Sequence, residues 1–295
     1  MHLSPEQIQQ FRRDGFIVAR GLFADHDLAP VRAAIAADID RRASQLKADG
    51  QLDDTYANES FDRRMGLLMR DCPQIHEAFD ICHLRDPAFH RLFHTPGLHH
   101  ALGQLLDSPE ITCNPIQHLR VKPPSDWVES TGYFAVPWHQ DSGVTTDDAD
   151  DALIITCWIP LLRADAEMGC MRLLPGVHQQ GHLRHIPGTT IDPSLIDETQ
   201  AVLAPCECGD AVLMTQFTPH HSTPNLSQSC RWSIDMRFQR SGTPTGRAWQ
   251  PELVVASADP NQVRNDAATW ATSWQRCLAE GRGHGQHRIE EPTKA

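Results

Sequence analysis

The sequence contains no long hydrophobic run. Hydrophobic residues make up 40% of the 295 residues, yet no apolar segment approaches the roughly 20 residues that a membrane-spanning helix needs. The first residues, MHLSPEQIQQFRRDGF, also lack the apolar stretch of a signal peptide. We therefore expect no membrane contact and a cytoplasmic location.

Positive charge is also scarce. The chain has 26 Lys and Arg against 38 Asp and Glu, and its formal net charge is -12 at pH 7. A surface that binds nucleic acid would need clustered basic residues. We therefore exclude nucleic acid as a partner and expect a small-molecule substrate, because a local pocket can differ in sign from the whole chain.

Cysteines with paired spacing are missing. The chain has nine Cys, an odd number, and Cys206 and Cys208 form the one close pair. A zinc site would need two more ligands at suitable spacing. We interpret the cysteines as small hydrophobic residues of the core in a reducing compartment.

The N-terminal segment predicts a capped helix followed by a strand. Ser4 is a good N-cap, Pro5 suits the first helical position, and Gln7 completes a capping box. Gly15 is expected to end this helix. Residues 16–18 (FIV) then predict a short strand that enters the body of the protein.

Further helices are expected before residue 110. One begins after Asp25 or Asp27 and presents an apolar face. That face consists of Leu28, Val31, Ile35 and Ile39. The charged stretch 41–63 lacks clear periodicity, and we interpret it as a loop or a mobile lid. Residues 67–106 predict short helices that are interrupted at three prolines.

From residue 111 the pattern changes to short apolar runs separated by Pro and Gly, which favours an antiparallel sandwich or barrel. The predicted strands are 116–121, 134–138, 153–159, 171–174, 211–217 and 232–238. Near the end, Trp270 and Trp274 are spaced to share one face of a helix. The sequence therefore predicts a mainly β protein with helical decoration.

A candidate metal motif lies inside this β-rich region. His139 and Asp141 are two positions apart, so a strand directs both side chains to the same face. A third ligand is available from His220 or His221, and spacing alone does not choose between them. Two His and one carboxylate leave one side of the ion open, as iron(II) oxygenases require.

Arg231 strengthens this interpretation, since an isolated H-x-D motif is common by chance. It follows the second histidine cluster on the next predicted strand. An arginine there could bind the far carboxylate of 2-oxoglutarate in bidentate fashion, while the 2-oxo acid end chelates iron. Taken alone, Arg231 would read as a surface salt-bridge residue.

Several segments in order resemble the phytanoyl-CoA dioxygenase family of iron(II)- and 2-oxoglutarate-dependent oxygenases. They are LSPEQIQQFRRDGFIVARGLF, HLRVKPP, WHQD, CWIPL, MGCMRLLPGVH, CGDAVLM and HHSTPN followed by Arg231. The resemblance covers residues 3–238, and chance agreement of so many segments in one order is improbable.

The resemblance implies roles for particular residues. It selects His220 over His221 as the third metal ligand beside His139 and Asp141, because Ser222, Asn225 and Arg231 then match the distal motif of the family. The residues implied at 2-oxoglutarate are Arg231, Ser222, Trp158, His118 and Gln117. No catalytic residue beyond the metal ligands is implied.

The resemblance also implies the fold and its division. Family members form a double-stranded β-helix, a cupin-like jelly roll braced by N-terminal helices. We expect one domain over residues 1–280, with a mainly helical support at 1–110, a jelly-roll core at 111–240 and a helical part at 241–280. Residues 281–295 are expected to form a flexible tail.

The implied activity uses Fe(2+), with 2-oxoglutarate and O2 as co-substrates. A C–H bond of a small molecule would be hydroxylated, with release of succinate and CO2, by a monomer or homodimer. Related halogenases carry a small residue where this chain has Asp141, so the carboxylate favours hydroxylation. The alternative is a metal-binding cupin-type protein without oxygenase activity, which would have no use for Arg231.

Other residues near the motifs are interpreted as structural or solvent-exposed residues without a functional role. The residues interpreted as surface charge or solvated loop histidines are Arg120, Arg172, Arg237, His178, His182 and His185. The aromatic residues Tyr133, Phe134 and Trp138 are interpreted as core. Residues 141–151, rich in Asp and Thr, are a candidate lid over the site.

Overall fold

The computed structural model describes residues 2–128, 136–187, 189–285 and 287–288. The helices are α1 Pro5–Asp14, α2 Asp25–Ala48, α3 Phe61–Asp71, α4 Ile81–Leu84, α5 Pro87–Phe93, α6 Pro96–Leu106 and α7 Ala267–Ala279. The strands are β1 Phe16–Ala19, β2 Ile111–Lys122, β3 Ile154–Pro160, β4 Met171–Leu173, β5 His185–Ile186, β6 Thr190–Ile191, β7 Val202–Ala204, β8 Ala211–Thr215, β9 His220–Ser222, β10 Arg231–Arg240 and β11 Leu253–Ala256.

The first helix and strand confirm the N-terminal prediction. The Gln7 N–H donates to Ser4 Oγ at 3.3 Å, and the Ser4 N–H donates to Gln7 Oε1 at 2.9 Å. These two bonds satisfy amide groups that the first turn leaves without helical partners. Gly15 closes the helix in the left-handed region, at a φ of 85°. Strand β1 follows directly.

The interpretation of residues 41–63 as a loop or lid was wrong for part of that stretch. Helix α2 continues to Ala48, and α3 begins at Phe61. Arg41 and Arg42 both pair with Asp38, one helical turn earlier. This end of α2 is thus stabilised by ion pairs between charged side chains one turn apart, and such a helix shows little apolar periodicity.

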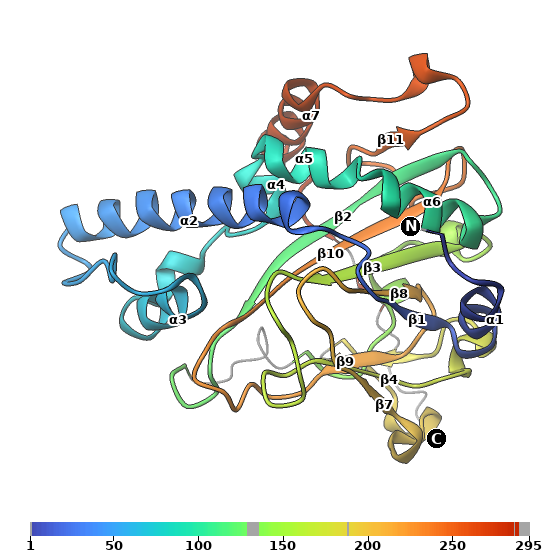
Figure 1. The fold of residues 1–295 in the computed structure, drawn as a ribbon, viewed down its shortest axis with the longest axis horizontal. Helices are drawn as coiled ribbons and strands as arrows, with labels where there is room; N and C mark the ends of the chain where they lie inside the picture. Colours follow the sequence, from blue (N-terminus) through green and yellow to red (C-terminus); the bar gives the residue numbers. More distant parts are fainter. Residues whose placement is uncertain (1, 129–135, 188, 286, 289–295) are drawn as a thin grey trace.

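A six-stranded antiparallel sheet forms the centre of the protein, in the order β1-β8-β3-β10-β2-β11. Helices α2, α5 and α6 lie over one of its faces (Figure 1). Alternate residues of the central strands, such as Ile155 and Cys157 on β3 and Trp232 and Ile234 on β10, are buried in the cluster shared with the helices. The residues between them face the other way.

A smaller sheet, in the order β7-β4-β9, lies on the side opposite the helices (Figure 1). A second apolar cluster fills part of the space between the sheets, with Trp158 and Val212 from one and Met171 and Leu173 from the other. Two antiparallel sheets packed face to face and braced by helices confirm the predicted double-stranded β-helix.

Some predictions fall in or beside regions that are not described. Of the predicted strand 134–138, residues 134 and 135 lie outside the described residues, as does Tyr133, and residues 136–138 are not a strand. In the predicted tail, Arg288 pairs with Asp150 at 2.7 Å. The single-domain division stays a prediction. No helix in the described ranges is long and apolar enough to cross a membrane.

Candidate metal centre and co-substrate cavity

Two histidines from distant parts of the chain meet in the space between the sheets. An isolated antiparallel bridge joins His139 to His220 on β9, with N–H to carbonyl distances of 3.0 and 2.9 Å. The imidazole centroids lie 4.1 Å apart. The backbone itself therefore holds the two rings side by side.

Each ring is oriented by a carbonyl two residues earlier. Nδ1 of His139 lies 2.9 Å from the carbonyl oxygen of Pro137, and Nδ1 of His220 lies 2.9 Å from that of Thr218. A carbonyl can only accept, so both Nδ1 atoms donate a proton, and Nε2 is the ring nitrogen left to coordinate a metal. Metal-bound histidines are commonly oriented in this way.

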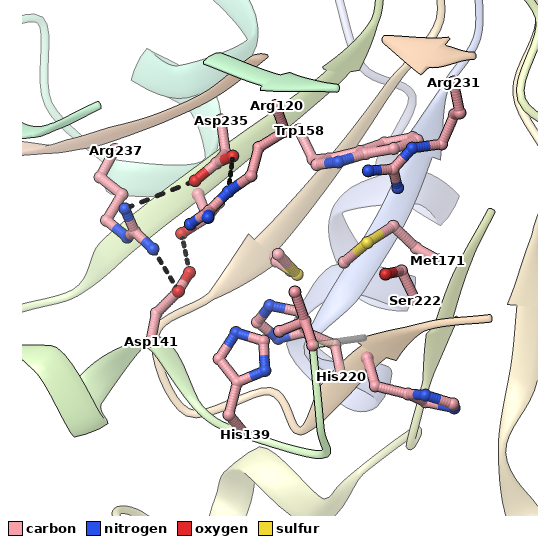
Figure 2. A pocket seen from close by; sticks show the side chains of 14 residues that line it. Arg120, His139, Asp141, Trp158, Met171, His220, Ser222, Arg231, Asp235 and Arg237 are labelled. Atoms are coloured by element: carbon pink, nitrogen blue, oxygen red, sulfur yellow. Dashed lines mark hydrogen bonds and ion pairs between the residues drawn. The ribbon is translucent and has the colours of Figure 1, made fainter. Parts of the chain in front are cut away.

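Asp141 completes the group. One donor atom from each of His139, Asp141 and His220 lies within 4.8 Å of the others, and Asp141 is deeply buried. Its carboxylate accepts a hydrogen bond from Arg237 (Figure 2) and another from the hydroxyl of Thr156. Burial alone would raise the pKa of Asp141, but the Arg237 guanidinium holds it well below its usual range.

The three side chains fit iron(II). Burial, followed by the proximity of His220, lowers the pKa of His139 to about 3, so this ring is neutral and able to coordinate at neutral pH. Two imidazoles and one carboxylate are a donor set suited to iron(II), and they leave positions for other ligands. His221 is not part of the group, and its ring lies 4.2 Å from that of Trp138.

Arg231 lies at the other end of the same cavity, on β10 (Figure 2). Its side chain is buried, and the guanidinium carbon lies 5.4 Å from the centroid of the Trp158 ring. Nη1 reaches the Gly169 carbonyl at 3.3 Å, while the buried Nε has no hydrogen-bond partner. In the described part of the chain, no carboxylate lies within 4 Å of Arg231.

An unpaired buried guanidinium indicates a place for an anion, because burying a charge without a partner is costly. Burial lowers the pKa of Arg231 to about 10, so it stays charged at neutral pH. Ser222 lines the same cavity. Lys122 donates to the Ser222 hydroxyl at 2.7 Å, and burial lowers the pKa of this lysine to about 7. These groups fit the distal carboxylate of 2-oxoglutarate.

The structure brings most of the predicted residues to this cavity, but not all of them. Trp158, Ser222 and Arg231 line it together with the three candidate ligands. His118 lines a neighbouring cavity, and its Nδ1 lies 2.8 Å from Asp80 Oδ2. Gln117 points away from the metal centre: its amide donates to the Asn114 carbonyl at 3.0 Å, so this placement gives no support to its predicted role.

Two ordinary interpretations were wrong. Arg237 is not a surface charge but a buried partner of Asp141. His185 is not a solvated loop residue: it is buried, and its Nε2 accepts from the Gln140 N–H at 3.1 Å, which supports the segment between the ligands. His182 also contacts this segment, at 2.7 Å from the Ser142 hydroxyl.

Sequence reasoning missed three polar residues of the site, Thr156, Lys122 and Asp235. Asp235 pairs with Arg237, at 3.8 Å, and with Arg120 on the neighbouring strand (Figure 2). One available signal for Asp235 was the alternation of polar residues at 231, 233, 235 and 237 with the apolar residues at 232, 234, 236 and 238.

A jelly roll that holds two imidazoles, one carboxylate and a buried arginine in one cavity defines a class: the mononuclear metal-dependent oxygenases. The profile of "Phytanoyl-CoA dioxygenase (PhyH)" matches residues 11–233. The chain therefore belongs to the phytanoyl-CoA dioxygenase family and is an iron(II)- and 2-oxoglutarate-dependent oxygenase.

Individual relatives agree with this assignment. Phytanoyl-CoA dioxygenase domain-containing protein 1 of Bos taurus is 27% identical over 289 residues, which cover 85% of this chain and 94% of the relative. The 1-deoxypentalenic acid 11-beta-hydroxylase of Streptomyces exfoliatus is 29% identical over 128 residues, 38% of this chain and 44% of that protein. The apo structure of the non-heme monooxygenase ThoJ shares the fold, with a TM-score of 0.63 and 20% identity over 93% of this chain and 98% of ThoJ.

Proposed function

We propose that the chain hydroxylates a C–H bond of a small-molecule substrate, with His139, Asp141 and His220 as iron ligands and Arg231 as the anchor of 2-oxoglutarate. The observation that carries the proposal is the meeting of these four side chains in one cavity, with Arg231 buried and unpaired. A metal-binding protein without oxygenase activity would gain nothing from an unpaired buried cation beside its metal.

Iron(II), when held by these residues, would supply the redox chemistry that couples oxidation of the substrate by O2 to the conversion of 2-oxoglutarate to succinate and CO2. The protein orients the partners. The Pro137 and Thr218 carbonyls keep both imidazoles in the tautomer that coordinates through Nε2. Arg237 and Thr156 fix the Asp141 carboxylate.

Arg231, Ser222 and Trp158 form the far end of the co-substrate site. The guanidinium can donate two parallel hydrogen bonds to the distal carboxylate, and the Ser222 hydroxyl, next to Lys122, can add a third. The buried Trp158 ring forms one wall. Hydroxylation is favoured because Asp141 supplies a carboxylate ligand, and the Streptomyces exfoliatus relative is described as a hydroxylase.

Anaerobic titration with iron(II) and 2-oxoglutarate tests the proposal. The wild-type protein should develop the metal-to-ligand charge-transfer band of the ternary complex. Arg231→Gln should weaken 2-oxoglutarate binding by about 30-fold or more, because two charge-assisted hydrogen bonds are lost at about 1–2 kcal/mol each. Iron binding itself should change little in this variant.

The neighbouring histidines provide a matched pair of variants. His220→Ala should abolish the band, whereas His221→Ala should keep it, since His221 lies outside the ligand group. Succinate release across a panel of substrates then measures turnover. Full activity of Asp141→Ala, or loss of iron from His221→Ala but not from His220→Ala, would overturn the assignment.

A further inference from the structure

A second cavity, of about 420 Å³, opens beside the candidate metal centre. It shares His139 and Asp141 with the co-substrate cavity and extends to residues 283–285 near the C-terminus. Its volume suits a small organic molecule. A molecule bound there would lie next to the candidate metal ligands, as the primary substrate must. This cavity is therefore the candidate binding site for the primary substrate.

The walls of this cavity are rich in arginine, although the chain as a whole carries a net charge of -12. Its lining arginines are Arg120, Arg237, Arg247 and Arg288. Among the described residues that line it, Asp141 is the one carboxylate, and Asp141 already pairs with Arg237. The residues that line the cavity therefore carry more positive than negative charge, opposite to the chain as a whole.

Three of the four arginines have carboxylate partners. Arg237 pairs with Asp141, Arg120 lies 3.5 Å from Asp235, and Arg288 lies 2.7 Å from Asp150. Arg288 also donates to the carbonyl of Thr146 at 2.7 Å. The charges of these three arginines are therefore balanced within the protein.

Arg247 differs from the other three. It is 6% exposed, and its Nε and Nη1 donate only to neutral acceptors, the Val144 carbonyl at 2.9 Å and Gln250 Oε1 at 3.4 Å. Across the described ranges, no carboxylate lies within 4 Å of it, and its Nη2 makes no hydrogen bond. Burial lowers its pKa to about 10, so it remains cationic at neutral pH.

The Arg247 guanidinium packs closely against Gly285, where no side chain separates the two. A Cβ added to Gly285 would lie 2.2 Å from Nη2 of Arg247. His118 and His284 also line the cavity and are further hydrogen-bonding groups near Arg247. Arg247 lines the cavity and keeps one donor without a hydrogen bond. Such a buried guanidinium is most stable when an anion binds it.

We propose that the primary substrate carries an oxyanion, either a carboxylate or a phosphoryl group, and that Arg247 binds it. This inference rests on the proposed function for the position of the substrate beside iron. The two unpaired buried arginines then have separate roles. Arg231 binds the co-substrate, and Arg247 binds the substrate so that a C–H bond is directed to the metal.

Calorimetric titration of the anaerobic iron(II)–2-oxoglutarate complex tests the proposal with simple probes. Butyrate and inorganic phosphate represent the two oxyanions, and butyramide is the neutral match of butyrate. At least one anion should bind about tenfold or more tightly than butyramide. Arg247→Gln should weaken that binding about tenfold or more, whereas the exposed Arg41→Gln on α2 should leave it unchanged.

The charge-transfer band is recorded in the same titration. It should persist when the anion binds, because the anion sits on Arg247 and not on iron. If Arg247→Gln does not fold, Arg247→Lys replaces it and should keep the preference for the anion over the amide. A wild-type protein without the band would defeat the proposed function, while the anion titration would still report on Arg247.

Four outcomes overturn the assignment: equal binding of butyrate and butyramide, unchanged anion affinity in Arg247→Gln, no anion preference in Arg247→Lys, or loss of the band on anion binding. The assignment is also overturned if neither anion shows saturable binding below about 50 mM. Such binding would be weaker than one charge-assisted contact in a preformed site should give. If phosphate alone binds, the oxyanion is a phosphoryl group; if butyrate alone binds, it is a carboxylate.

Discussion

Replacing Arg237 by Met tests how the protein maintains its candidate metal ligand. The side chains of Arg237 and Asp141 are 5% and 2% exposed, so their ion pair is shielded from water. In the variant, the Thr156 hydroxyl remains as the partner of a buried charge. Breaking such a pair on one side costs about 3–5 kcal/mol. We expect the metal-free variant to lose that amount of unfolding free energy.

Iron(II) should reduce this loss. A bound cation compensates the Asp141 charge that Arg237 compensates in the metal-free protein, so the variant gains more from iron than the wild type does. Urea unfolding under anaerobic conditions, with and without iron(II), measures both effects. The control is Arg41→Met, which removes a partly exposed pair with Asp38 on α2 and should cost less than about 1 kcal/mol.

Two results would refute this reasoning. One is a loss below about 1 kcal/mol in metal-free Arg237→Met, which would mean that the pair contributes no more than a surface salt bridge. The other is an equal loss with and without iron(II), which would mean that the metal does not bind Asp141.

Two further predictions concern the same region. Burial lowers the pKa of Lys122 to about 7, so its ammonium form, which favours binding of the dicarboxylate, is lost as the pH rises. The affinity for 2-oxoglutarate, measured from the charge-transfer band, should therefore fall between about pH 6 and pH 8 in the wild type. It should fall less in Lys122→Met. An equal fall in both proteins would contradict this. Gly15→Ala should lower the unfolding free energy by about 1–3 kcal/mol, since its Cβ would lie 2.7 Å from Thr218 Oγ1. Gly50→Ala, at a similar φ with nothing within 4 Å of its Cβ, should cost about 1 kcal/mol or less in thermal unfolding.

Local features of the fold could be predicted because their causes lie within a few residues. The capping box of α1 needs only Ser4 and Gln7 at the correct spacing, and Gly15 is needed where the backbone takes a positive φ. The short strands after residue 111 could be found from apolar runs and turn residues in the same way. The C-terminal end of α2 could not be predicted, because ion pairs between charged side chains stabilise it and leave no apolar pattern.

The candidate metal ligands could also be inferred from sequence, for two different reasons. His139 and Asp141 were inferred from strand alternation, but His139 forms an isolated bridge and Asp141 begins a 3-10 helix, so the pair was correct although its predicted strand was wrong. The choice of His220 over His221 needed the family resemblance, and the bridge between His139 and His220 gives its physical basis. Arg231 was inferred from its place on the following strand, although its burial and its missing partner are visible only in three dimensions.

By itself, then, the amino-acid sequence determined the helix caps, the β-rich class and the set of residues able to hold a metal, since these depend on short-range spacing and side-chain chemistry. Tertiary structure alone decided which charges are buried and which are paired. Nothing in the sequence around Arg237 and Arg247 distinguishes their roles. In the fold, strand β10 places Arg237 beside Asp141, whereas Arg247, in the segment after β10, lines a cavity without a carboxylate partner. The difference depends on which chain segments meet across the fold, and no local pattern encodes that.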